Sequence, residues 1–152
     1  MRGICLRKGA GQHETPTHAR ITVAEGVVGD RWRAADDPER LSQVTLMNAT
    51  AADLVAFADS PAHAAGDNFY VDLDLGESAL PVGAQLRLGT ALLEVTAEPH
   101  LGCKNFNERF GAGALRWVNH KDHRHLRLRG VNLRVVEDGV VSVGDSVELG
   151  ST

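Results

Sequence analysis

The sequence is short of several residue types and patterns that mark particular classes of protein. It contains only two cysteines, and its aromatic residues are two tryptophans, one tyrosine and four phenylalanines. No apolar run approaches the roughly 18 residues that a membrane-spanning helix needs. The first apolar stretch is interrupted by Arg2, Arg7 and Lys8, which is unlike a secretory signal peptide. We therefore expect no membrane partner and no export.

The two cysteines, Cys5 and Cys103, lie far apart in the chain. Without an export signal, the expected location is the cytoplasm, where thiols stay reduced. We therefore expect two free thiols rather than a disulfide.

The chain also lacks an excess of positive charge. Its 16 lysines and arginines face 20 aspartates and glutamates, which gives a net charge of −4. Phosphate backbones are bound through basic surfaces. The composition therefore predicts that nucleic acid is not a partner.

What remains is the composition of an ordinary globular protein. Hydrophobic residues make up 43% of the chain and charged residues 24%. A chain of this size buries roughly 68–70% of its extended surface on folding. The length of 152 residues predicts a single domain over residues 1–152.

Alternating apolar and polar residues recur along the chain and predict β-strands. The fold class is therefore expected to be mainly β, with a few short helices. The stretches with this pattern are Ile4–Leu6, Arg20–Ala24, Gln43–Met47, Phe69–Leu75, Leu86–Leu88, Leu92–Ala97, Val131–Val135 and Val147–Leu149.

One segment has helical spacing instead. Apolar residues recur between Ala51 and Ala58, and either Asn48 or Thr50 can cap the helix at its start. Ser60-Pro61 is expected to end it, because the residue before a proline disfavours helical geometry.

Turns and loops divide the strands. Gly9–Thr17 and Arg31–Arg40 are predicted to be loops, the second of them exposed. Asp138-Gly139 is a strong signal for a two-residue β-hairpin. Val82–Gly89 and Val143–Gly150 share one pattern, a turn with glycine followed by an alternating strand. Such a repeated corner is typical of a β-barrel.

Cys103 is the first candidate for chemistry. Gly102 allows an unusual backbone before it, and Lys104–Phe110 can form a short helix that ends at Gly111. Cys103 then lies at the helix N-terminus, where the helix dipole lowers the pKa of a thiol. A thiolate there could act as a nucleophile, a sulfur carrier or a soft metal ligand. The alternative is a buried inert cysteine, which composition alone favours for Cys103 and favours more strongly for Cys5. Positive charge near Cys103 is supplied by His100, Lys104 and Arg109.

Histidines gather in the same part of the chain, and they leave two interpretations open beside an ordinary exposed surface. Together with Cys103 they could form a zinc site, although their spacing is loose. Alternatively, the polar stretch Asn119–Arg129 could bind an anion in this otherwise acidic protein. The four histidines concerned, of seven in the chain, are His100, His120, His123 and His125.

Several short motifs follow one another in an order that resembles the MOSC domain. This module occurs at the C-terminus of molybdenum cofactor sulfurases and as small stand-alone proteins. The resemblance covers residues 20–149, and its most specific parts are Gly66–Phe69 and Gly102–Gly111. In chain order the motifs are Gly29–Arg31, Gln43–Leu46, Gly66–Phe69, Val82–Gly89, Leu92–Thr96, Gly102–Gly111 and Val143–Asp145.

The resemblance implies a barrel-like β fold and a function centred on Cys103. In the family, the corresponding cysteine carries sulfur as a persulfide or ligates molybdenum in a bound molybdopterin cofactor. Related stand-alone members reduce N-hydroxylated bases, so a small-molecule substrate and a sulfur or electron donor protein are implied partners. Larger members carry a pyridoxal-phosphate domain, for which this chain has no room.

The resemblance also implies site residues. Cys103 would be the catalytic residue and metal ligand, and a set of polar residues would hold the anionic cofactor or position the substrate. A second interpretation is a non-catalytic binding or thiol-sensing module that has lost the cofactor. Two differences from the reductase-like members favour it. The stretch Trp32–Pro38 is acidic here, whereas the corresponding stretch of those members is rich in His and Gly. Gly102 stands where those members have proline. The proposed cofactor-binding residues are Arg31, Asn68, Lys104, Asn107 and Arg109.

Overall fold

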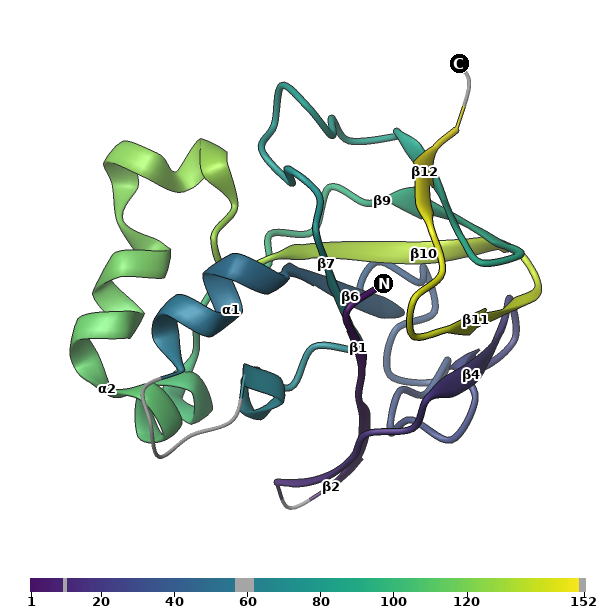
Figure 1. Cartoon of the computed structure of the whole chain (residues 1–152), viewed down its shortest axis with the longest axis horizontal. Coiled ribbons are helices and arrows are strands. Elements are labelled where there is room, and N and C mark those ends of the chain that lie inside the picture. The colour runs from purple at the N-terminus through teal and green to yellow at the C-terminus, as the bar shows by residue number, and fades with distance from the viewer. Residues whose placement is uncertain (10, 57–61, 151–152) are drawn as a thin grey trace.

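A computed structural model describes residues 1–9, 11–56 and 62–150 of the chain (Figure 1). Its main feature is a sheet of seven strands that curls into a half-barrel, which confirms the mainly β prediction. In spatial order the strands are β1 (Gly3–Ile4), β7 (Phe69–Val71), β6 (Val44–Asn48), β10 (Val131–Glu137), β9 (Ala91–Val95), β8 (Gln85–Leu88) and β12 (Val147–Leu149). Among the described residues, no helix is both long and apolar enough to span a bilayer.

A second sheet holds β11 (Gly139–Ser142), β4 (His18–Thr22) and β5 (Gly26–Val27). The predicted hairpin at Asp138-Gly139 is wrong, because β11 does not pair with β10 but with β4. Asp138 itself shows the reason, since its Oδ1 accepts a hydrogen bond of 2.7 Å from the backbone N–H of Val23, beside β4. The chain therefore turns a corner here and passes from one sheet to the other.

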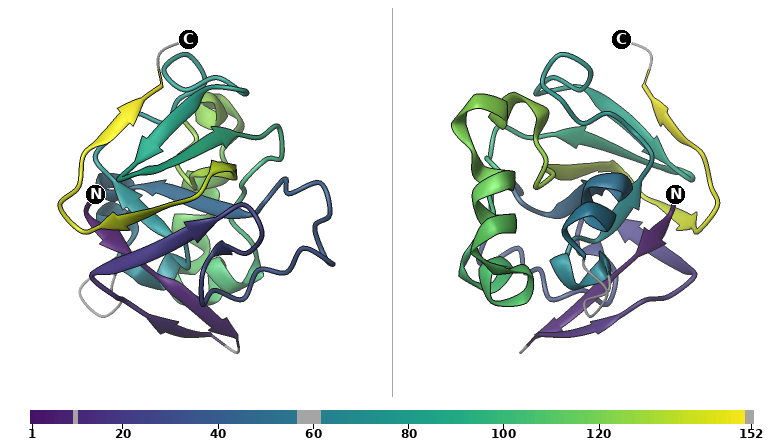
Figure 2. Two further views of the ribbon diagram at one scale, coloured as in Figure 1. Left: turned by 90° about the vertical axis from the view of Figure 1, so that its right-hand side faces the viewer. Right: turned by 60° about the vertical axis from the view of Figure 1, so that its left-hand side comes forward.

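A separate two-stranded ribbon is formed by β2 (Leu6–Gly9) and β3 (Gln12–Glu14). The sequence predicted a loop over Gly9–Thr17, and this prediction is wrong for β3. The ribbon projects from the lower side of the molecule in Figures 1 and 2.

The strands meet in an apolar core that follows their alternation. Leu86, Leu88, Leu93, Leu133 and their neighbours are fully buried inside the curled sheet. A smaller apolar cluster joins the helices to the sheet, and its members include Cys5, Met47, Tyr70, Phe106 and Phe110. The helices therefore lie together against one side of the sheet (Figures 1 and 2).

The first helix is α1 (Ala49–Val55), followed by the 3-10 helix η1 (Ala62–Ala65). Asn48 is the N-cap, because its side chain accepts a hydrogen bond of 2.9 Å from the N–H of Ala51. The predicted end at Ser60-Pro61 lies outside the described residues.

The second helical segment is α2 (Lys104–Asn119), followed by the 3-10 helix η2 (Lys121–Leu126). Gly111 interrupts α2 with a φ of 86°, so the predicted short helix Lys104–Phe110 is confirmed. The sequence does not predict the further helical stretch after Gly111, because Gly111 and Gly113 are poor helix formers.

Candidate functional site

A pocket of about 260 Å³ opens beside Cys103, and we call it the Cys103 pocket. Its wall comes from five parts of the chain. These are the β2–β3 ribbon, the loop after β5, the end of η1 with the residue after it, residues between His100 and Arg109, and the chain before β10. None of its described lining residues is acidic. Its charged or titratable lining residues are Arg7, His13, Arg31, His100, Cys103, Arg109 and Arg129.

Cys103 is exposed and forms the N-cap of α2. The residue before it is fixed by Asn119 at the other end of the same helix. The N–H of Gly102 donates to Asn119 Oδ1 at 2.8 Å, and Asn119 Nδ2 donates to the Gly102 carbonyl at 3.0 Å. This pair of bonds holds the backbone that presents the Cys103 thiol to the pocket.

Gly102 is required for space rather than for an unusual backbone. A Cβ atom at this position would lie 2.7 Å from Leu115 Cδ1, closer than a side chain tolerates. The sequence prediction of an unusual backbone at Gly102 is wrong, because Gly102 is not among the glycines with a positive φ. Two aromatic residues of the same helix, Phe106 and Phe110, are buried and pack against each other, with tilted rings whose centroids lie 4.8 Å apart. They fasten the start of α2 to the core.

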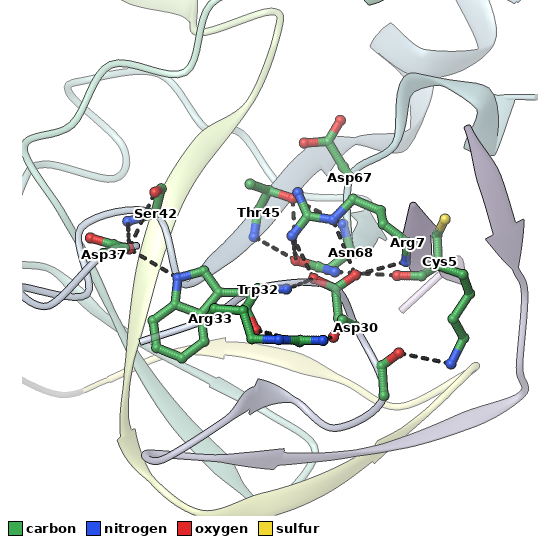
Figure 3. A network of polar contacts seen from close by, with 12 residues as sticks. Cys5, Arg7, Asp30, Trp32, Arg33, Asp37, Ser42, Thr45, Asp67 and Asn68 are labelled. Atoms are coloured by element: carbon green, nitrogen blue, oxygen red, sulfur yellow. Dashed lines mark hydrogen bonds and ion pairs between the residues drawn. The ribbon is translucent and has the colours of Figure 1, made fainter. Parts of the chain in front are cut away.

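Beneath the pocket, Arg7 and Asp30 form a buried ion pair (Figure 3). Arg7 donates to Asp30 from Nε at 3.1 Å, from Nη2 at 2.7 Å and from its backbone N–H at 2.7 Å. Burial alone would raise the pKa of the Asp30 carboxyl, but the bonds from Arg7 outweigh it and hold the pKa below its usual value. This carboxylate is therefore ionised and neutralises the Arg7 guanidinium.

Asn68 supports the same network from inside. Its side-chain oxygen accepts hydrogen bonds from the Thr45 N–H at 3.0 Å and from Arg7 Nη2 at 3.4 Å. Its amide donates to the Cys5 carbonyl at 3.3 Å (Figure 3). Asn68 is fully buried and does not line the pocket, so it acts on the pocket by holding Arg7.

A second buried group joins Asp67, His100 and Arg129. His100 Nε2 lies 2.6 Å from Asp67 Oδ1, and Arg129 pairs with Asp67 Oδ2 and donates to the Ala65 carbonyl at 3.0 Å. Asp67 is fully buried, which would raise the pKa of its carboxyl, but Arg129 and His100 outweigh burial and lower it. Burial lowers the pKa of His100, and Asp67 only partly opposes this.

Two of the four arginines that line the pocket form ion pairs with these buried carboxylates. Arg7 and Arg129 are each neutralised by an aspartate below the wall. Arg31 is exposed, and no described carboxylate pairs with it. Arg109 donates to the Ala64 carbonyl at 2.7 Å, which holds its guanidinium at the wall. Gly66 leaves room for it, because a Cβ atom there would lie 3.2 Å from Arg109 Nη1. The described wall thus offers guanidinium groups and a thiol, a combination suited to an anionic ligand.

A wider hollow of about 530 Å³ adjoins the Cys103 pocket, since Arg7, Arg31 and His100 line both. Trp32 forms part of its wall, and Trp32 Nε1 donates to Asp37 at 3.0 Å. Asp37 also accepts hydrogen bonds of 2.9 Å from the N–H group of Leu41 and from that of Ser42, the second of which Figure 3 shows. The acidic stretch after Arg31 is therefore a folded loop, built around one carboxylate.

The structure brings together some of the site residues that the sequence suggested. Cys103, Arg31 and Arg109 line one pocket, whereas Lys104 and Asn107 do not. Lys104 is exposed and pairs with Glu108 at 3.8 Å. Arg7, His13 and Arg129 were missed as pocket residues. The sequence suggests an exposed surface over Asn119–Arg129, but Arg129 is buried against Phe106, with its guanidinium carbon 5.2 Å from the ring centroid.

The zinc interpretation finds no support in the described part of the chain. Among its residues, no group of three His, Cys, Asp or Glu side chains could hold a metal ion. His120 and His123 stack on each other at 5.1 Å, while His100 is turned toward Asp67. The histidines that are near in sequence therefore point to different places.

Comparisons with known proteins agree with the resemblance found in the sequence. The family model "MOSC domain" matches residues 40–148. No curated protein matches the chain. Among solved structures, YuaD from Bacillus subtilis is 15% identical with a TM-score of 0.63, and the match covers 99% of this chain and 94% of that one. YiiM from Escherichia coli is 21% identical with a TM-score of 0.62, covering 100% and 71%. YiiM from Geobacillus stearothermophilus is 17% identical with a TM-score of 0.61, covering 98% and 73%. At these identities the structural likeness establishes the fold.

Proposed function

The chain belongs to the MOSC domain family, and from this premise we propose that it binds a molybdenum cofactor through Cys103 and reduces N-hydroxylated small molecules. The observation that carries the proposal is the Cys103 pocket itself. An exposed thiol shares it with Arg31 and Arg109, and no described acidic residue lines it.

The side chains present fit this cofactor by their chemistry. Molybdopterin is anionic through its phosphate, and the metal takes a soft thiolate ligand. Cys103 would supply the thiolate, and Arg31 and Arg109 would bind the anionic groups. The neighbouring hollow, with the fixed indole of Trp32, would give a flat heterocycle further space. These two cavities share a wall, so one extended ligand can occupy both.

The reaction converts an N–OH compound into the corresponding N–H compound and water, and consumes two electrons and two protons. When bound, the cofactor would supply a redox centre able to pass on the two electrons that this reduction consumes. The electrons come from a separate electron-donor protein. The chain's own residues orient the ligands, because the Asn119–Gly102 bonds fix the position of Cys103 and the buried aspartates fix Arg7 and Arg129.

The test is elemental analysis of protein purified from cells that make the cofactor. We expect about one molybdenum per chain in the wild type and almost none in Cys103→Ser. Cys5→Ala is the matched control, because Cys5 is buried in the helix–sheet cluster and should not affect the metal.

Molybdenum retained in Cys103→Ser would remove Cys103 as the ligand. A metal-free wild type would overturn the proposal and favour the non-catalytic or thiol-sensing interpretation. In that case, mass spectrometry of Cys103 would show whether the thiol carries a persulfide instead.

A further inference from the structure

His100 has two different edges, and they face different surroundings. One edge is held inside the protein, where Nε2 lies 2.6 Å from Asp67 Oδ1. The imidazole is 16% exposed, and His100 lines the Cys103 pocket, the adjoining hollow and a third hollow that Gly130 also lines. One edge of the ring is thus held by Asp67, while another part of the ring is exposed to these cavities.

The anchored edge decides which nitrogen carries the hydrogen. Asp67 is fully buried, and its partner Arg129 keeps it ionised, so its oxygens can only accept hydrogen bonds. His100 Nε2 must therefore donate. The charged groups around the ring are Asp67, Arg129 and Arg7, and their combined effect with burial lowers the pKa of His100. A neutral imidazole with hydrogen on Nε2 leaves a lone pair on Nδ1.

The open edge has no hydrogen-bond partner in the described part of the chain. Nδ1 of His100 makes no bond to any described residue, and it is not among the atoms sealed away from solvent. The Cδ2 side of the ring packs against Gly130, where a Cβ atom would lie 3.1 Å from it. A residue that carries an acceptor without a described partner therefore lines the pocket that holds Cys103.

We propose that His100 is the substrate-orienting acceptor of the Cys103 pocket, and that Asp67 and Arg129 are positioning residues that hold it as the Nε2–H tautomer. His100 Nδ1 would accept a hydrogen bond from the O–H of a bound N–hydroxyl compound. This assignment rests on the proposed function for the class of substrate, whereas the tautomer does not depend on that function.

The binding test uses two variants and two ligands. His100→Gln can place an amide N–H where Nε2 was, so it keeps the bond to Asp67 but removes the acceptor at Nδ1. His100→Asn does the reverse, because its shorter side chain brings an amide oxygen close to the position of Nδ1. The ligands are benzamidoxime, which has an O–H donor, and its O-methyl ether, which does not.

Binding is measured by calorimetry on the cofactor-loaded protein without an electron donor, so that no turnover occurs. We expect His100→Gln to bind benzamidoxime about 5- to 10-fold more weakly than the wild type, the effect of one hydrogen bond. The O-methyl ether should bind both proteins equally, and His100→Asn should recover part of the affinity for benzamidoxime. Equal binding of benzamidoxime to the wild type and His100→Gln would overturn the role of His100.

The tautomer is tested separately by nitrogen NMR of histidine-labelled protein, with or without cofactor. At pH 7 the wild type should show a neutral His100 with hydrogen on Nε2. A hydrogen on Nδ1 would overturn the assignment. Because this readout needs no molybdenum, failure of the proposed function in the elemental analysis would leave it unaffected, and the two failures can be distinguished.

Discussion

Replacing Asp67 by asparagine should destabilise the protein more than any change on its surface. The carboxylate is fully buried and holds Arg129, which is itself 93% buried as a side chain, and His100 at 2.6 Å. Removing one charge leaves the Arg129 guanidinium inside the protein without a counter-ion. Breaking a buried ion pair in this way costs about 3–5 kcal/mol. We expect a loss of that size in the free energy of unfolding at pH 7, measured by urea titration followed by tryptophan fluorescence.

The control is Asp53→Asn, which removes a carboxylate from an exposed pair. Asp53 lies 3.6 Å from Arg2, and both side chains are more than half exposed. Such pairs contribute less than about 1 kcal/mol. If Asp67→Asn does not fold, the double variant Asp67→Asn/Arg129→Met should recover stability, because it leaves no lone charge. A loss below about 1 kcal/mol for Asp67→Asn would refute the argument that this charge is needed.

The same pair sets a pH dependence whose sign follows from the lowered pKa of Asp67. A carboxyl whose pKa is lower in the folded state than in the unfolded state stabilises the fold above the unfolded value of about 3.9. That stabilisation is lost as the pH falls through the folded-state pKa. The difference in unfolding free energy between wild type and Asp67→Asn should therefore shrink below about pH 4. A difference that grows on acidification would contradict this assignment.

Three further outcomes concern the pocket. Iodoacetamide at pH 8 should label Cys103 and spare Cys5 in native protein, because Cys5 is buried and burial raises the pKa of its thiol to about 12. Equal labelling of the two cysteines, measured by peptide mass spectrometry, would show that Cys5 is accessible. Asn119→Ala should lower the free energy of unfolding by about 1–3 kcal/mol, since two backbone groups of Gly102 lose their partners, and it should accelerate labelling of Cys103. An unchanged labelling rate would mean that these bonds do not hold the backbone before Cys103. Gly66→Ala should lower stability by about 1–2 kcal/mol, because the φ of Gly66 is 78°, and a thermal melt identical to that of the wild type would argue against the left-handed turn.

The strands were the most predictable part of the fold. Residues such as Leu86, Leu88 and Leu133 are buried on one side of the sheet, and their alternation is a direct consequence of strand geometry. The pairing of strands was less predictable. Asp138-Gly139 has the composition of a hairpin turn, but the interaction that redirects the chain is a bond to Val23, far away in the sequence. No local pattern contains that information.

The sequence pointed to some of the residues that line the Cys103 pocket and missed others. Cys103, Arg31 and Arg109 stood out because they lie in or near recognisable motifs. Arg129 looked like part of a solvated basic stretch, because its partner Asp67 lies in a distant segment. A buried arginine and an exposed one have the same appearance in a sequence until the partner carboxylate is known.

The origin of the pocket wall has a consequence for how such a protein can diversify. The family match covers residues 40–148, but Arg7, His13 and Arg31 precede it, and all three line the Cys103 pocket. The β2–β3 ribbon and the loop after β5 thus contribute part of the pocket wall from outside the matched segment. Substitutions in this early part of the chain can alter which ligands enter, while Cys103 and the sheet behind it stay as they are.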